Sequence, residues 1–211
     1  MADAGRVIAG TARSIRLDAP GEGTRPLADR VKQTLFAILE PDLRGATFLD
    51  LFAGSGAAGI EALSRGAAHA IFVERDTDAI RTIAANLRRT GLADRATVTR
   101  AEAVAWLRDP RREHETRLDV VVIDPPYDDT DALVKALEAV GPLAAPGARV
   151  VAKHFWRNAP PARVGLLASD RGRRFGETAL TFYRRADRAD EAAQAAEITP
   201  AATSGDNMED A

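Results

Sequence analysis

The sequence predicts one α/β domain built on a mostly parallel, seven-stranded sheet that an antiparallel hairpin closes. Between about residues 46 and 185, apolar runs of strand length alternate with segments of helical periodicity. This alternation implies a parallel sheet with helices on both faces. The last two apolar runs have no helix-length segment between them, so we expect them to form the hairpin. A Gly-rich turn after the first strand is typical of the ligand-binding end of such sheets.

The elements follow from periodicity and turn residues. The expected strands are apolar runs of five or six residues: Thr47–Leu51, Ala70–Glu74, Ala96–Arg100, Leu118–Ile123, Arg149–Lys153, Arg163–Leu167 and Ala179–Arg184. The expected helices have apolar residues three and four apart: Arg30–Leu39, Ala57–Arg65, Thr77–Thr90, Ala103–Arg108 and Asp131–Val140. The first of these helices should end before Pro41, because proline disrupts a helix interior.

Three segments divide the chain. Residues 1–40 pair short apolar stretches with arginines around Pro20, Gly21 and Gly23, which predicts a small β-hairpin followed by the first helix. Residues 41–185 form the α/β core. Residues 186–211 hold seven acids, one arginine and almost no large apolar group. Such a segment buries too little surface to offset chain entropy, so we expect a disordered acidic tail.

Composition narrows the functional classes. The 211 residues are 45% apolar but hold no run long enough to cross a membrane, and the N-terminus lacks a signal pattern. The chain has no cysteine, and its three histidines are isolated, which argues against thiolate catalysis and against a metal centre. We therefore expect a cytoplasmic protein that uses no metal. We also expect it to be a monomer.

The turn after the first core strand reads Asp50-Leu-Phe52-Ala-Gly54-Ser55-Gly56. Gly54 and Gly56 tolerate positive φ and let a ligand approach the backbone closely. The spacing differs from the G-x-G-x-x-G of dinucleotide sites, which hold a pyrophosphate on backbone N–H groups. A carboxylate such as Asp50 instead suits the ammonium of an amino acid.

Two further strands end in acids. Glu74 lies twenty residues after Gly54, where an acid can accept hydrogen bonds from both ribose hydroxyls. Glu102 follows the next strand and is placed to accept from an adenine amino group, while the Ala103 backbone N–H is an additional donor. Amino acid, ribose and adenine together predict S-adenosyl-L-methionine as the cofactor.

The motif Asp124-Pro125-Pro126-Tyr127 follows the apolar strand Leu118–Ile123. The prolines remove two N–H donors, so Asp124 and the Pro125 carbonyl form a corner rich in acceptors beside the Tyr127 ring. Such a corner suits an exocyclic amino group on a stacked base. Together the two motifs predict a Rossmann-like, class I S-adenosylmethionine-dependent methyltransferase acting on an amino nitrogen. An acceptor-only aspartate favours guanine, which presents adjacent N1–H and N2–H2 donors, although aspartate also occurs in adenine-modifying sites.

The chain resembles the RsmD family of 16S rRNA guanine-N2 methyltransferases from about Arg6 to Tyr183. The resemblance rests on RVIAG, TRPLADRVKQTLF, LDLFAGSGAAGIEALSRGA, IDPPY and FGETALTFY, of which the second is the most specific. It implies methylation of one guanine of 16S rRNA, in an assembling small ribosomal subunit. It also implies cofactor binding at Asp50, Gly54, Gly56 and Glu74, and a reacting base at Asp124 and Tyr127.

The resemblance gives the N-terminal segment a purpose, which is to contact RNA phosphates. The candidate residues are Arg13, Arg16, Arg25, Arg30 and Lys32. The chain departs from the family pattern at Lys153, where an acid is frequent. Other hypotheses are an adenine-N6 DNA methyltransferase, a protein-glutamine methyltransferase, and a non-catalytic module that binds the assembling ribosome. The absence of a separate target-recognition domain argues against DNA, and an intact Asp124–Tyr127 motif argues against a purely binding role.

Overall fold

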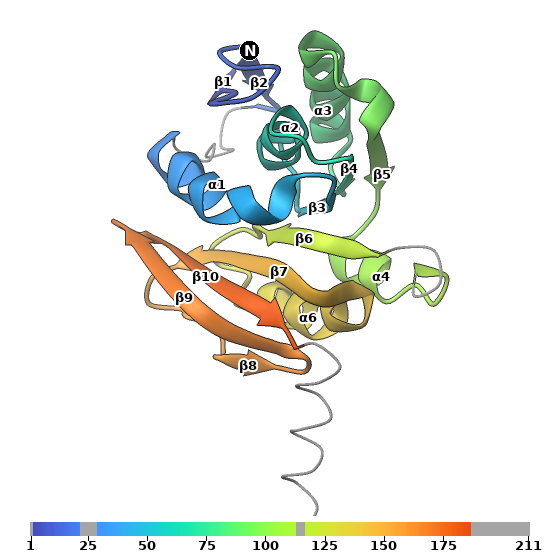
Figure 1. The fold of residues 1–211 in the computed structure, drawn as a ribbon. Helices are drawn as coiled ribbons and strands as arrows, with labels where there is room; N and C mark the ends of the chain where they lie inside the picture. Colours follow the sequence, from blue (N-terminus) through green and yellow to red (C-terminus); the bar gives the residue numbers. More distant parts are fainter. Residues whose placement is uncertain (1, 22–28, 113–116, 187–211) are drawn as a thin grey trace, which may run out of the picture.

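The computed structural model describes residues 2–21, 29–112 and 117–186. Within them an eight-stranded sheet has the strand order β5-β4-β3-β6-β7-β10-β9-β8 (Figure 1). Five strands are parallel: β3 (Thr47–Leu51), β4 (His69–Glu74), β5 (Ala96–Arg100), β6 (Leu118–Ile123) and β7 (Ala144–Phe155). Three antiparallel strands extend the sheet beyond β7: β10 (Thr178–Arg185), β9 (Leu167–Phe175) and β8 (Arg163–Val164).

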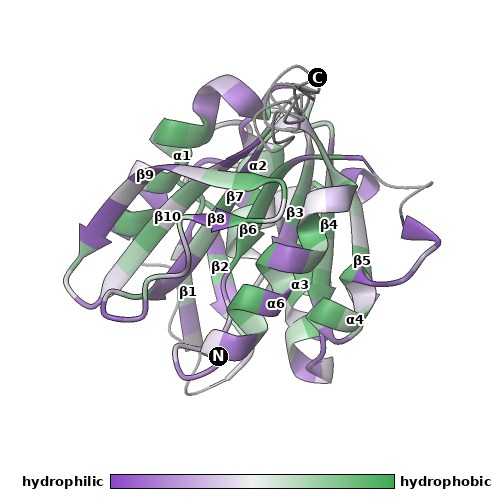
Figure 2. Ribbon diagram, turned by 90° about the horizontal axis from the view of Figure 1, so that it is seen from below, coloured by the Kyte–Doolittle hydropathy of each residue, from purple (hydrophilic) through white to green (hydrophobic). Residues whose placement is uncertain are grey.

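The predicted α/β class, the mostly parallel sheet and the antiparallel closure are confirmed, but the predicted number of strands is wrong. The expected strand Arg163–Leu167 is two strands, the short β8 and the start of the long β9. Most of β9 is an exposed, arginine-rich stretch without apolar alternation, and its outer end is purple in Figure 2. It is a strand because it pairs with β10 along its whole length, and such pairing leaves no trace in local periodicity.

Helices cover both faces of the sheet (Figure 1). One face carries α1 (Asp29–Leu43), α2 (Ala57–Ser64) and α3 (Thr77–Thr90), and the other carries α4 (Ala103–Leu107) and α6 (Thr130–Val140). Short 3-10 turns lie at Ala93–Arg95 and Gly141–Leu143. Successive residues of β3 alternate between the two layers, since Phe48 packs with the first group of helices and Leu49 with the second.

The sequence predicted that helix α1 would end before Pro41, and this prediction is wrong. The helix continues to Leu43. Pro41 lies in the last turn, where the missing N–H removes a single hydrogen bond. Leu39 and Leu43 are both buried in the core beneath the helix. Their burial stabilises the additional turn.

The N-terminal residues form the predicted hairpin, from β1 (Ala2–Arg6) and β2 (Arg16–Ala19). The fully buried carboxylate of Glu61 on α2 accepts hydrogen bonds from the backbone N–H groups of Ile8 (2.7 Å) and Ala9 (3.0 Å). The buried Asn86 on α3 bonds to both backbone groups of Asp18 at 2.9 Å. These contacts attach the hairpin to the side of the core that carries α2 and α3.

The sheet has its topological switch point between β3 and β6. From β3 the chain proceeds outward to β4 and β5, whereas β6 leads to β7 on the opposite side. In open parallel sheets, ligands bind beyond the carboxyl ends of the strands at this point. The position of the switch therefore identifies where a site should be sought.

Candidate active site

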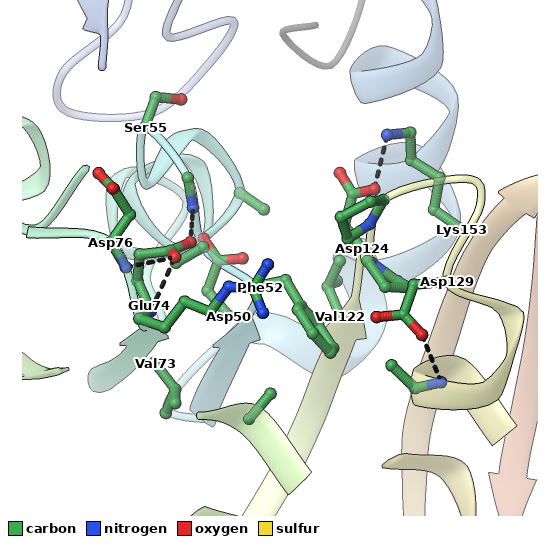
Figure 3. Close-up of a pocket in the computed structure, with 18 of the residues that line it drawn as sticks. Asp50, Phe52, Ser55, Val73, Glu74, Asp76, Val122, Asp124, Asp129 and Lys153 are labelled. Atoms are coloured by element: carbon green, nitrogen blue, oxygen red, sulfur yellow. Dashed lines mark hydrogen bonds and ion pairs between the residues drawn. The ribbon is translucent and has the colours of Figure 1, made fainter. Parts of the chain in front are cut away.

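A cavity of about 510 Å³ lies at the carboxyl ends of the parallel strands (Figure 3). Its walls come from the segments that follow β3, β4, β5 and β6, together with the end of β7. Ten of the residues that the sequence singled out line it: Asp50, Phe52, Gly54, Ser55, Glu74, Glu102, Ala103, Asp124, Pro125 and Tyr127. The tertiary structure thus brings the two separate motifs into one pocket.

The Gly-rich turn has a left-handed backbone at three positions. Phe52 has φ 61°, Gly54 has φ 53° and Gly56 has φ 77°. The Gly54 N–H donates to Glu74 Oε2 at 2.9 Å, and the other carboxylate oxygen of Glu74 accepts from the backbone N–H groups of Arg75 and Asp76. Glu74 therefore holds the turn in place, a role that the sequence does not reveal, in addition to presenting an acid to the cavity.

Gly56 does not line the cavity, contrary to its predicted role in cofactor binding. It begins helix α2, and an added Cβ would lie 3.2–3.3 Å from the side chains of Ile83 and Phe72. Its missing side chain lets the helix start pack on the core. The left-handed conformation that the sequence predicted is confirmed, but it serves the turn and the packing beneath it.

Asp50 is the most unusual acid in the cavity. Its side chain ends at the cavity floor, is 2% exposed, and accepts one hydrogen bond, from the Gly59 N–H at 2.8 Å. Burial raises the pKa of Asp50 to about 8, and the nearby negative charges of Asp124 and Glu74 act in the same direction. A cation bound beside it would restore the ionised form, so this position fits a positively charged ligand group.

Glu102 begins helix α4 as its N-cap. Its two carboxylate oxygens accept from the backbone N–H groups of Val104 (3.0 Å) and Ala105 (2.6 Å). This capping fixes the carboxylate at the cavity wall beside Ala103. Each oxygen retains a second lone pair, so the predicted acceptance from an adenine amino group is compatible with the cap.

The Asp124-Pro125-Pro126-Tyr127 motif forms the opposite wall. The Asp124 N–H donates to the Leu51 carbonyl of β3 at 3.2 Å, and the Tyr127 hydroxyl lies 2.6 Å from Thr178 Oγ1 on β10. Burial raises the pKa of Asp124, and the Lys153 ammonium opposes this rise. Lys153 Nζ donates to Asp124 Oδ1 at 2.6 Å. The sequence marked Lys153 only as a departure from the family pattern; its place in the site follows from the pairing of β7 with β6.

The residues predicted to contact RNA differ in their exposure. Arg13 and Arg30 are exposed, and Arg16 is exposed while pairing with Asp3 at 2.8 Å. The prediction that Lys32 contacts RNA is wrong, because Lys32 is fully buried and its ammonium donates to the Arg6 carbonyl at 2.5 Å. It cannot contact a phosphate while it fastens α1 to the hairpin. Arg25 lies outside the described residues, as does the predicted acidic tail from residue 187 onward.

In residues 2–21, 29–112 and 117–186, no three or more histidine, cysteine, aspartate or glutamate side chains are grouped so that they could hold a metal ion. Over the same part of the chain, no helix combines the length and apolar character needed to span a membrane.

Known proteins resemble this chain in both sequence and fold. The profile of the family described as "Conserved hypothetical protein 95" matches residues 5–184. The chain is 38% identical over 183 residues to "Putative rRNA methyltransferase YlbH" of Bacillus subtilis, covering 85% of this chain and 98% of the relative. It is 41% identical over 123 residues to "Ribosomal RNA small subunit methyltransferase D" of Escherichia coli, covering 58% of this chain and 60% of the relative.

Solved structures of methyltransferases have the same fold as this chain. The "Putative methyltransferase yhhF" from Escherichia coli superposes with a TM-score of 0.76 at 30% identity, covering 87% of this chain and 98% of that one. A "putative methylase" from Haemophilus influenzae gives a TM-score of 0.72 at 27% identity, covering 88% of this chain and all of that one. These matches confirm the methyltransferase fold expected from the sequence. With a family profile that spans almost the whole described core, the chain belongs to the RsmD family.

Proposed function

We propose that the protein transfers a methyl group from S-adenosyl-L-methionine to the exocyclic N2 amino group of a guanine in 16S rRNA. One observation carries the proposal. The acceptor corner of Asp124 and Pro125 lines the same cavity as the buried Asp50 and the strand-end Glu74. The relatives named as small-subunit rRNA methyltransferases support the choice of RNA.

The residues fit S-adenosyl-L-methionine part by part. Asp50 is a buried carboxylate whose raised pKa favours a neighbouring cation, which suits the amino-acid end. Glu74 is placed for the ribose hydroxyls, and Glu102 with the Ala103 N–H for the adenine. When bound, this cofactor supplies a methyl group activated by a positively charged sulfur. All remaining work is orientation and electrostatics by the protein.

The acceptor corner explains how an amino group of low nucleophilicity can react. The lone pair of a base amino group is delocalised into the ring. Hydrogen bonds from its N–H groups to Asp124 and to the Pro125 carbonyl favour a pyramidal nitrogen whose lone pair points into the cavity. The half-buried Tyr127 ring, held by Thr178, offers a flat surface against which the base can stack. A base in a duplex must first be extruded to reach this wall.

The N-terminal segment, residues 1–40, would contact the RNA while residues 41–185 carry out methyl transfer. The exposed Arg13, Arg16 and Arg30 are the phosphate contacts that we propose. The hairpin adjoins the cofactor side of the cavity, because Asn86 also donates to the Ser55 carbonyl at 3.0 Å. RNA held by the hairpin therefore lies next to the site. The proposed substrate is an assembling small ribosomal subunit.

The test supplies methyl-labelled S-adenosyl-L-methionine to purified protein with immature small-subunit particles, naked 16S rRNA, DNA or protein extract. Nucleosides are then digested and analysed by mass spectrometry. We expect N2-methylguanosine from the ribosomal substrates. Label on DNA, on protein or on adenine, with none on guanine, would overturn the proposal.

A variant tests the acceptor corner. Asp124→Ala should abolish turnover while S-adenosylhomocysteine binding, measured by calorimetry, stays within a few-fold of the unmodified protein. The matched control is Asp128→Ala, an exposed aspartate four residues further along the same loop, which should leave activity unchanged. Near-native turnover by Asp124→Ala would show that this carboxylate has no part in the reaction.

A further inference from the structure

Lys153 lies near the end of β7, directly beside the acceptor corner. The register between the parallel strands pairs Ile123 with Ala152, so the next residues, Asp124 and Lys153, lie side by side at the carboxyl edge of the sheet. Lys153 Nζ is 2.6 Å from Asp124 Oδ1 and 5.0 Å from the centre of the Tyr127 ring. Figure 3 shows the Lys153 side chain reaching the Asp124 carboxylate. The ammonium thus contacts the carboxylate and lies over the ring, at the wall where the proposed base would bind.

Both members of the pair retain unused hydrogen-bonding capacity. An ammonium has three N–H donors, of which Lys153 gives one to Asp124 Oδ1. In the part of the chain that the structure describes, its other two N–H groups have no acceptor, and Asp124 Oδ2 has no donor. The side chains are only 11% and 24% exposed, yet both line the cavity. A ligand that enters the cavity could form the hydrogen bonds that these sheltered groups lack.

The pair can offer a ligand one donor and two acceptors: a free N–H of Lys153, the second lone pair of Asp124 Oδ1, and Asp124 Oδ2. Because Lys153 Nζ contacts Oδ1, the order of these groups is donor, acceptor, acceptor. The hydrogen-bonding edge of guanine carries the complementary order, with the O6 acceptor followed by the N1–H and N2–H2 donors. Adenine presents a donor at its 6-position and an acceptor at N1, so it would set like groups against both residues.

We propose that Lys153 is a specificity-determining residue that donates to guanine O6 while Asp124 accepts from N1–H and N2–H2. This inference rests on the proposed guanine-N2 activity and deepens it, because it names the residue that selects the base. Pairing with Asp124 and contact with the Tyr127 ring hold the ammonium in position before the base arrives. The pair therefore recognises guanine as the edge of a cytosine would.

The test compares the unmodified protein with Lys153→Met, which keeps the apolar stem and removes the donor. Substrates are small-subunit particles carrying either guanine or 6-thioguanine at the methylated position, which is first mapped with the unmodified protein. Sulfur at position 6 is a weaker acceptor than oxygen, while N1–H and N2–H2 remain as donors. On guanine, Lys153→Met should lower kcat/KM by about 10- to 100-fold, the effect of losing a hydrogen bond to a charged group.

The decisive measurement is the ratio of kcat/KM on guanine to that on 6-thioguanine. The unmodified protein should favour guanine several-fold, and Lys153→Met should show no preference. Lys153→Arg, which keeps a cationic donor, should restore part of both rate and preference. If Lys153 served only to hold Asp124 in place, Lys153→Met would slow both substrates equally and retain the preference, which would overturn the inference.

Two controls separate this inference from the proposed function. Lys135→Met makes the same change at a half-exposed lysine on α6 that pairs with Asp131, and it should leave both rates unchanged. S-adenosylhomocysteine affinity should be equal in all variants. If the unmodified protein methylates no guanine, the proposed function fails and the inference with it. If it methylates guanine and Lys153→Met does so equally well, only the inference fails.

Discussion

Replacing Asp50 by asparagine should make the ligand-free protein more stable at high pH. Burial raises the pKa of Asp50 from 3.8 to about 8. Between those values the folded state holds a proton that the unfolded chain has released, so the free energy of unfolding falls as pH rises. Each pH unit within this window removes up to about 1.4 kcal/mol, so the total is on the order of 5 kcal/mol. Asp50→Asn is uncharged at every pH and keeps an oxygen to accept from the Gly59 N–H.

Urea unfolding followed by circular dichroism at several pH values from 4 to 9 measures this effect. The stability difference between Asp50→Asn and the unmodified protein should grow by several kcal/mol across the range, in favour of the variant. The exposed Asp128→Asn should show no such trend. In calorimetry, Asp50→Asn should lose affinity for S-adenosyl-L-methionine, since the carboxylate that faces the cation is gone. Parallel stability curves for the variant and the unmodified protein would refute the assignment of a buried, destabilising carboxyl group.

Three other predictions concern core packing, the attachment of the hairpin and the pH dependence of activity. Gly59→Ala should cost roughly 2 kcal/mol in urea unfolding, because its Cβ would come within 2.3 Å of a buried aromatic ring, whereas Gly141→Ala has room and should be neutral. Glu61→Ala leaves two backbone N–H groups and the Nε–H of Arg65 without their acceptor, so hydrogen exchange should show the N-terminal hairpin opening more often. Activity should fall at low pH as Asp124 becomes protonated, because burial raises the pKa of this residue. Lys153→Met should move that fall to higher pH in a rate profile, since the ammonium that opposes the rise is gone. An unmoved profile would contradict the pairing.

Much of the site was predictable because its residues are marked by local sequence. Asp50, Glu74 and Asp124 each follow or end an apolar run, and the carboxyl ends of parallel strands meet at one edge of the sheet. The positive φ values at Gly54 and Gly56 were equally predictable, since few other residues adopt them. Once the strands are assigned, convergence of these groups follows from the architecture alone.

The errors lie where contacts distant in sequence outweigh local preference. The long β9 has no apolar alternation and exists through its pairing with β10. Lysine is usually a surface residue, but Lys32 is buried against the Arg6 carbonyl, 26 residues earlier in the chain. Gly56 supports packing on Phe72 and Ile83 instead of lining the cavity. Periodicity and motif spacing contain no information about such partners.

The α/β class, the Gly-rich turn and the acids at the strand ends can be read from the amino-acid order, because they depend on backbone sterics and on the alternation of apolar residues. The charge state and partners of these acids depend on how the elements pack. Asp50 has its raised pKa because helix and sheet close over it, and Asp124 has Lys153 as a partner because the register of β6 against β7 joins residues 29 positions apart. Burial and strand register arise from the packed whole, so the charges at Asp124 and Lys153 and the proposed choice of base are properties of the fold.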